Sequence, residues 1–273
     1  MRNVTGRELA KALDMDYAHR ERILDQFTRQ AVPFATAPAI RNQEALDRIV
    51  LMSNAGRDDT VLDVACGPGL LVCAFAPVVK HATGIDITPA MLEQARALEQ
   101  ERGLSNVSWR LGDVLPLPYD DGQFSIVSAR FAFHHLLDPL EVLKEMARVC
   151  KTGGYVVVAD SAPAAAKADA FNAMERLRDP SHVRAMPLEE LCQLFTAAGL
   201  GEPRIDAYRL EAELEGLLER SFPAPGDAAR IRRIFEDSLA DDALDMATQR
   251  RDGMIYLSFP VAILGARLGT LGT

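Results

Sequence analysis

The stretch VLDVACGPGLL, residues 61–71, decides the fold predicted for this chain. An apolar run that contains Asp63 leads into a turn with Gly67 and Gly69, and further apolar residues follow. A strand, a tight glycine turn and a helix in this order place backbone amides and a helix N-terminus at the carboxyl end of the strand. Open α/β sheets bind their ligands at this place. The aspartate four residues before the first glycine then restricts which ligand fits.

The rest of the chain alternates strand patterns with helical patterns. After a first strand at 60–65, we expect strands at 81–86, 107–113, 124–129, 154–160, 203–210 and 260–268. Pro260 is compatible with the last of these only at the beginning of the strand. The alternation predicts an α/β fold of the Rossmann-like, doubly wound type, with a mostly parallel sheet covered by helices on both faces.

The two ends of the chain differ from this pattern. Residues 1–56 carry helical patterns before the first strand, and residues 211–252 have the pattern of inserted helices broken by a Pro/Gly turn. We expect a Rossmann-like core over 57–210 with its final strand in 253–273. The two helical segments are expected to form caps on this core.

Composition and charge argue against several function classes. The net charge of −9 disfavours binding to nucleic acid and to anionic membrane surfaces. No run approaches the roughly 18 apolar residues of a membrane helix, so stable membrane insertion is not expected. The N-terminus lacks the apolar core of a signal peptide. The four cysteines have no CxxC or metal-type spacing, which favours reduced thiols in the cytoplasm over disulfides or a metal site.

The glycine turn does not match a dinucleotide fingerprint. That motif needs G-x-G-x-x-G, whereas Val72 stands three residues after Gly69. A pyrophosphate would also lie poorly beside Asp63, whose carboxylate suits a cationic ligand, because opposite charges attract strongly away from bulk water. S-adenosylmethionine carries both an ammonium group and a sulfonium, so it fits this turn better than NAD.

Two further acids follow the next two strands. Asp86 ends the second strand, where a carboxylate can accept hydrogen bonds from both ribose hydroxyls. Asp113 ends the third strand, where its carboxylate can accept a hydrogen bond from the adenine amino group. Ile87 and Val114 can make apolar contact with the faces of the adenine ring. Each acid alone can also be an ordinary strand-end or helix-cap residue. Acids at three successive strand ends favour a cofactor site.

Four motifs resemble those of class I S-adenosylmethionine-dependent methyltransferases: VLDVACGPGLL, GIDITPAMLEQAR, LGDVLPLPYDDGQFSIVSARFAFHHLLDP and RVCKTGGYVVVAD. Within that family the chain is most similar to the small-molecule branch that includes the quinone-biosynthesis C-methyltransferases. The resemblance implies a seven-stranded sheet with an antiparallel last strand, and S-adenosyl-L-methionine as cofactor. It places adenine at Asp113, ribose at Asp86 and methionine at the turn 63–69. The residues expected at the cofactor are Asp63, Ala65, Gly67, Pro68, Gly69, Asp86, Ile87, Met91, Asp113, Val114 and Arg130.

The segment ARFAFHHLLDP after the fourth strand carries the candidate catalytic residues. His134 or His135 can take a proton from a phenol or another hydroxyl, because the pKa of histidine lies near neutrality. The alternative is that one of them packs under the following helix and hydrogen-bonds to the backbone. Adjacent histidines diverge and have no carboxylate at ligand spacing, so a metal site is not expected.

Aromatic side chains are expected to bind the methyl acceptor. Tyr17 and Phe27 lie in the N-terminal helical region, and Phe131 follows the fourth strand. His182 can line the entrance after the fifth strand or order a loop there. Most aromatic residues at such positions are ordinary core residues, so these assignments depend on how the caps are placed.

We therefore expect a methyltransferase that moves a methyl group to an O, N or C atom of a small, partly apolar or aromatic acceptor. No protein nucleophile is needed, since the cofactor supplies the reactive methyl group and the protein aligns the reactants. One alternative is a nucleic-acid methyltransferase, which would need a basic groove or an added domain. Another is a protein that binds the cofactor without transferring methyl. A nicotinamide oxidoreductase is disfavoured by the missing third glycine.

Overall fold

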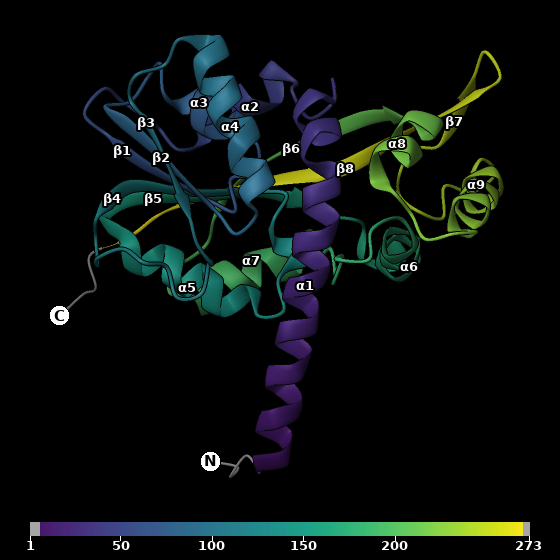
Figure 1. The fold of residues 1–273 in the computed structure, drawn as a ribbon, viewed down its shortest axis with the longest axis horizontal. Coiled ribbons are helices and arrows are strands. Elements are labelled where there is room, and N and C mark those ends of the chain that lie inside the picture. The colour runs from purple at the N-terminus through teal and green to yellow at the C-terminus, as the bar shows by residue number, and fades with distance from the viewer. Residues whose placement is uncertain (1–5, 270–273) are drawn as a thin grey trace.

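The structure, a computed structural model, describes the backbone of residues 6–269 and the side chains of residues 15–269. Its centre is one mixed β-sheet with the strand order β3-β2-β1-β4-β5-β8-β6, and a short β7 pairs with β8 outside this path (Figure 1). The strands are β1 (Thr60–Val64), β2 (His81–Asp86), β3 (Val107–Leu111), β4 (Phe124–Arg130), β5 (Cys150–Ser161), β6 (Arg204–Glu213), β7 (Gln249–Arg251) and β8 (Met254–Arg267). β1 to β5 pair in parallel, whereas β8 lies between β5 and β6 and is antiparallel to both. The predicted Rossmann-like sheet of seven strands with an antiparallel last strand is confirmed, and β7 adds an eighth strand.

Helices cover both faces of the sheet (Figure 1). They are α1 (Gly6–Thr36), α2 (Gln43–Met52), α3 (Leu70–Phe75), α4 (Pro89–Arg102), α5 (Pro139–Val149), α6 (Ala168–Arg178), α7 (Leu188–Ala197), α8 (Leu214–Ser221) and α9 (Asp227–Ser238). On one face α2, α3 and α4 bury Leu46, Val72 and Leu92. On the other face α5 and α7 bury Leu143 and Phe195. Strands covered on both faces explain the nearly continuous apolar runs of the sequence.

A third apolar cluster lies beyond the parallel part of the sheet. α6, α8 and α9 pack with β6 and β8 around Phe171, Ile231, Phe235 and Leu257. α8 and α9 fall within residues 211–252, and α6 adds a segment that directly follows β5. Together these helices form a cap beside the carboxyl ends of the strands.

Helix α1 connects this cap to the parallel part of the sheet. It runs beside α4 and α8, and its N-terminal end projects beyond the rest of the molecule (Figure 1). Gln26 Nε2 and Gln30 Nε2 donate to the Ser221 carbonyl oxygen of α8 at 2.6 and 3.3 Å. Further toward the N-terminus, Arg20 Nη1 lies 3.0 Å from Asp113 Oδ2, which follows β3. No helix within residues 6–269 combines the length and apolar character needed to cross a membrane.

The position of Pro260 differs from the prediction. β8 begins at Met254, so Pro260 lies inside the strand, opposite Arg209 of β6. The Pro260 carbonyl accepts a hydrogen bond from the Ala162 N–H at 2.9 Å on the β5 side. A residue other than proline at this position would direct its own N–H to the same side. The return hydrogen bond to Ala162 is therefore missing, and regular pairing with β5 begins only at Val261, so the proline stands where this pairing starts.

Candidate functional site

Two cavities lie near the carboxyl ends of the parallel strands, where α1 and the cap meet the sheet. The larger has a volume of about 630 Å³ and the smaller a volume of about 110 Å³. Phe27, Phe34, Phe131 and His135 line both cavities. Two ligands bound in the two cavities would therefore meet at these four side chains, which include the predicted acceptor residues Phe27 and Phe131.

Most residues predicted for the cofactor line the larger cavity. They are Asp63, Ala65, Gly67, Pro68, Asp86, Ile87, Met91, Asp113, Val114 and Arg130. The sheet topology explains why they gather, because β1, β2, β3 and β4 are parallel neighbours and their carboxyl ends share one edge. Gly69 belongs to the same prediction but does not line the cavity.

The turn between β1 and α3 needs unusual backbone conformations. Ala65, Gly67 and Gly69 have φ angles of 54°, 51° and 76°, in the left-handed region that favours glycine. A Cβ on Gly69 would overlap the ring of Trp109 and lie 2.9 Å from Ala95 Cβ. Gly69 therefore lets α3 lie close to β3 and α4.

Asp86 at the end of β2 holds this turn in place. Its Oδ2 accepts the Gly67 N–H and its Oδ1 accepts the Thr88 N–H, both at 2.8 Å. Burial raises the pKa of the Asp86 carboxyl group, although these two backbone donors oppose the shift. Each carboxylate oxygen keeps a second lone pair. Asp86 can thus accept two further hydrogen bonds from a ligand in the larger cavity, which it lines.

Asp63 and Arg130 bring opposite charges to the same cavity. Asp63 is 2% exposed and accepts the Ser128 hydroxyl at 2.7 Å. Burial raises the pKa of Asp63 to about 7, against the lowering effects of Ser128 and Arg130. Arg130 Nη1 donates to the Ile40 carbonyl at 3.1 Å, but its Nε and Nη2 are buried without a hydrogen-bond partner among the described residues. A ligand that carries both an ammonium and a carboxylate would satisfy both side chains.

Asp113 lies beyond β3 and lines the larger cavity. Its Oδ1 accepts the Val114 N–H at 2.7 Å, and its Oδ2 forms the ion pair with Arg20 at 3.0 Å. Arg20 is not among the residues predicted from the sequence, because no local pattern shows which residues of α1 face the sheet. A ligand amino group at Asp113 would share this carboxylate with Arg20.

His134 is buried in the short 3-10 turn η1 (Phe133–His135) that follows β4. Its Nδ1 lies 2.5 Å from Oδ1 of Asp160, near the end of β5. Burial lowers the pKa of His134, but the charge and the hydrogen bond of Asp160 outweigh this effect, so the pKa lies above its ordinary value. His134 lines only the smaller cavity. Asp160 was not predicted as a site residue, although an acid at a fifth strand end is the signal that could have found it.

His135 lines both cavities. Its Nδ1 lies 3.1 Å from the carbonyl oxygen of Ser181 and 3.1 Å from the hydroxyl of Ser181. Because that hydroxyl donates its own proton to Asp179 Oδ1 at 2.5 Å, Nδ1 of His135 carries the ring hydrogen. Burial and then the charge of His134 lower the pKa of His135 to about 4. His135 is therefore a neutral ring at physiological pH.

Two residues predicted to bind the methyl acceptor line neither of the two cavities. His182 is 5% exposed, its Nε2 pairs with Asn172 Oδ1 at 2.7 Å, and it lines neither cavity, because the loop after α6 folds inward. Tyr17 is 67% exposed and also lines neither cavity. Two residues further along α1, His19 is buried and its Nε2 donates to the His135 carbonyl at 2.7 Å. A shift of two residues turns a side chain to the other side of a helix, so His19 takes the inward position.

Comparison with known proteins finds methyltransferases. Residues 62–158 match the family described as methyltransferase domain. The chain is 31% identical over 221 residues to the uncharacterized methyltransferase YcgJ of Bacillus subtilis, which covers 80% of this chain and 87% of YcgJ. It is 39% identical over 113 residues to UbiE, a ubiquinone/menaquinone biosynthesis C-methyltransferase of Bdellovibrio bacteriovorus, covering 41% of this chain and 48% of UbiE. The crystal structure of YcgJ matches with a TM-score of 0.75 at 26% identity, over 83% of this chain and 99% of that chain.

Proposed function

Because the chain belongs to the family of class I S-adenosylmethionine-dependent methyltransferases, we propose that its larger cavity binds the cofactor and its smaller cavity binds the acceptor. The acceptor is a small, partly apolar or aromatic molecule that is methylated on an O, N or C atom. The observation that carries this division is the junction at Phe131 and His135, where ligands in the two cavities would meet. When bound, S-adenosylmethionine supplies an electrophilic methyl group, and the protein aligns it with the acceptor and excludes water.

The polar groups of the larger cavity support the assignment of the cofactor. Asp86 has free lone pairs for the two ribose hydroxyls beside the turn at Gly67. Asp63 offers a buried carboxylate to the ammonium group, and the unpaired nitrogens of Arg130 offer hydrogen bonds to the carboxylate of the methionyl part. Asp113 also lines this cavity, and we assign it to the amino group of adenine.

The apolar part of the smaller cavity's lining supports an acceptor that is partly apolar or aromatic, while another part carries the charged side chains of Glu175, Arg178, Asp179 and Arg220. Its apolar residues include Phe27, Phe34, Phe131, Leu210, Leu217 and Phe259. The ring edge of Phe27 packs against His135 with 5.0 Å between the ring centroids. His134 and His135 bring imidazole nitrogens to this cavity, and we assign the catalytic role to this pair.

The first test is calorimetric titration of the purified protein with S-adenosylmethionine, S-adenosylhomocysteine and NADH. We expect both adenosyl ligands to bind and NADH not to bind, because the turn lacks the third glycine of a dinucleotide site. Labelled S-adenosylmethionine is then offered with phenol, hydroquinone or aniline, and methyl transfer to at least one of them is expected. A folded protein that binds neither adenosyl ligand would contradict the cofactor site. Binding without transfer to any small acceptor would contradict the acceptor proposal.

Binding of the cofactor is expected to release protons from Asp63. In the free protein burial holds the pKa of Asp63 at about 7, so the carboxyl group is mostly protonated at pH 6. An ammonium group beside it favours the ionised form and lowers this pKa. At pH 6 the release should therefore approach one proton per S-adenosylhomocysteine, and affinity should rise with pH up to about 7 and then level off.

The released protons are counted by calorimetry in buffers with different ionisation enthalpies. Two controls should bind without the release: Asp63→Asn protein with S-adenosylhomocysteine, and wild-type protein with 5′-methylthioadenosine, which lacks the amino and carboxylate groups. Equal proton release from all three combinations would rule out Asp63 as the source.

A further inference from the structure

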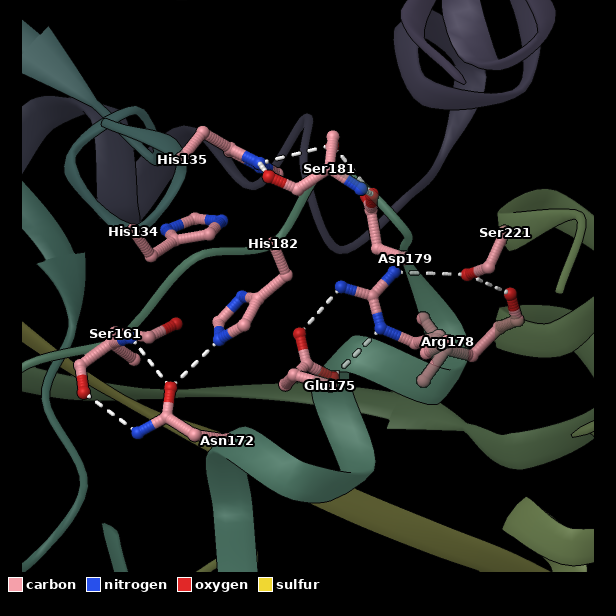
Figure 2. A network of polar contacts seen from close by, with 12 residues as sticks. His134, His135, Ser161, Asn172, Glu175, Arg178, Asp179, Ser181, His182 and Ser221 are labelled. Atoms are coloured by element: carbon pink, nitrogen blue, oxygen red, sulfur yellow. Dashed lines mark hydrogen bonds and ion pairs between the residues drawn. The ribbon is translucent and has the colours of Figure 1, made fainter. Parts of the chain in front are cut away.

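A network of polar side chains lies at the smaller cavity, and Figure 2 shows it extending from His134 and His135 past His182 to Arg178. Most of its members line this cavity, including Glu175 and Arg178. Asp160 belongs to the network, is 2% exposed and lines neither cavity. Its carboxylate accepts the Phe133 N–H at 2.7 Å and the Ser161 N–H at 2.6 Å, and it faces His134 Nδ1 at 2.5 Å. Of these three partners, only the imidazole can change its protonation state.

The contact with Asp160 determines which nitrogen of His134 carries the hydrogen. An ionised carboxylate only accepts hydrogen bonds, so Nδ1 donates, and the lone pair of the neutral ring is on Nε2. Nε2 of His134 has no hydrogen-bond partner among the residues whose side chains are described, and it is not fully buried. Because His134 lines the smaller cavity, this lone pair is available to a molecule bound there.

The charged groups around His134 favour a proton on this ring. Asp160 contacts it directly, and the charges of Glu175 in α6 and Asp179 just after α6 also raise the pKa of His134. Arg178 is the cation of this neighbourhood, and its charge is compensated by Glu175, whose Oε2 lies 2.6 Å from Arg178 Nη2. The electrostatic potential at the His134 ring is therefore negative, and the Asp160 carboxylate is the nearest group that contributes to it.

The two other imidazoles do not compete for this proton. The ring centroids of His135 and His182 lie 4.2 and 5.4 Å from that of His134. Burial and the charge of neighbouring imidazoles lower the pKa of both rings. A proton that arrives in this cluster is therefore held by His134.

We propose that Asp160 positions His134 as the base that takes the proton of the acceptor at Nε2, and that the acceptor is a hydroxyl compound methylated on oxygen. This inference rests on the proposed function and identifies the substrate class. An oxygen that gained a methyl group while keeping its hydrogen would be a strongly acidic cation, so a site that excludes water must supply a base. Asp160 lines neither cavity and acts through His134. It is thus a positioning residue.

The step balances in atoms and electrons. A lone pair of the hydroxyl oxygen forms the bond to the methyl carbon, the carbon–sulfur bond breaks, and its electron pair stays on sulfur. The hydroxyl proton moves to Nε2 of His134, and the Asp160 carboxylate compensates the new positive charge. The ring returns this proton to solvent when the cavity next opens.

The main test is an NMR pH titration of the histidine rings in the full-length protein, with and without S-adenosylhomocysteine. We expect His134 to titrate with a midpoint above 6.5, the ordinary value, and His134→Gln to remove this signal. Asp160→Asn should lower the midpoint by about one pH unit or more, because the neutral amide cannot stabilise the charged ring. A wild-type midpoint at or below 6.5, or one that Asp160→Asn leaves unchanged, overturns the inference.

A second readout is the pH dependence of methyl transfer to hydroquinone. For the wild type, kcat/KM should rise with pH and level off above the NMR midpoint, because the neutral ring is the active form. His134→Gln should lower the plateau by about 10²- to 10⁴-fold and remove the inflection, whereas the matched His135→Gln should keep the inflection. Loss of the inflection in His135→Gln instead, or methylation of aniline as fast as hydroquinone, overturns the assignment.

Two controls separate this inference from its premises. An amide at residue 160 cannot accept both backbone hydrogen bonds as the carboxylate does, so thermal unfolding of each variant is measured first. The NMR titration of the wild type and of His134→Gln decides the question even where Asp160→Asn does not fold. Failure to bind S-adenosylhomocysteine contradicts the proposed function, whereas normal binding with a different His134 titration contradicts only this inference.

Discussion

Replacing Asp86 with alanine is expected to weaken S-adenosylhomocysteine binding at least tenfold while the protein stays folded. Each charge-assisted hydrogen bond to a ribose hydroxyl contributes about 1.5–3 kcal/mol, and about 1.4 kcal/mol corresponds to a factor of ten. The same substitution removes the acceptor of the Gly67 and Thr88 N–H groups, so the turn also loses its anchor. Both effects weaken the binding of S-adenosylhomocysteine, and calorimetric titration measures the total loss of affinity.

Asp58→Ala is the matched control for Asp86→Ala. Asp58 is exposed and lines neither cavity, so its removal changes the net charge equally without touching the site. Affinity in this variant should equal that of the wild type. If the folded Asp86→Ala protein also bound as tightly as the wild type, the ribose assignment would be wrong.

Gly69→Ala is expected to lower the free energy of unfolding by about 2–5 kcal/mol. The left-handed conformation at φ 76° costs an L-residue about 1–2 kcal/mol. The added methyl group would overlap the Trp109 ring and crowd Ala95 Cβ, and overpacking of this kind costs about 1–3 kcal/mol. Urea unfolding followed by circular dichroism measures the loss.

Gly103→Ala separates the two contributions. Gly103 has a φ of 62°, but a Cβ there would meet nothing within 4 Å. This variant should therefore show only the conformational cost of about 1–2 kcal/mol. Equal losses in the two variants would mean that the contact with Trp109 contributes nothing.

The part of the site formed by the ends of parallel strands could be predicted from the sequence. Asp63, Asp86 and Asp113 each lie near the end of an apolar strand pattern or just after it, and strand patterns are local features of the chain. Neighbouring parallel strands end at one edge, so the three acids were expected to lie together, and all three line the larger cavity. Gly69 does not line this cavity, and its close packing against Trp109 could not be predicted, because a glycine required by packing looks the same in a sequence as one required by a ligand.

The parts that depend on distant contacts could not be predicted. His19 and Arg20 face the site because α1 packs across the sheet, and the rotation of such a helix is decided by residues far away in the chain. Tyr17 was therefore chosen in place of its inward neighbour. The partnership of His134 with Asp160 likewise requires that β4 and β5 be adjacent, which a pattern within either strand does not show.

The contacts that attach helix α1 to the rest of the fold differ in strength along its length. The Arg20–Asp113 ion pair has side chains 52% and 40% exposed, and such pairs contribute only about 0–1 kcal/mol. Gln26 and Gln30 are 1% and 4% exposed, and each buried polar group left unpaired would cost about 1–3 kcal/mol. Breaking the Arg20–Asp113 contact therefore costs less free energy than separating α1 from the Ser221 carbonyl. Beside Arg20, the buried His19 still holds α1 to the His135 carbonyl, so loss of the ion pair alone leaves the helix attached at the cofactor cavity.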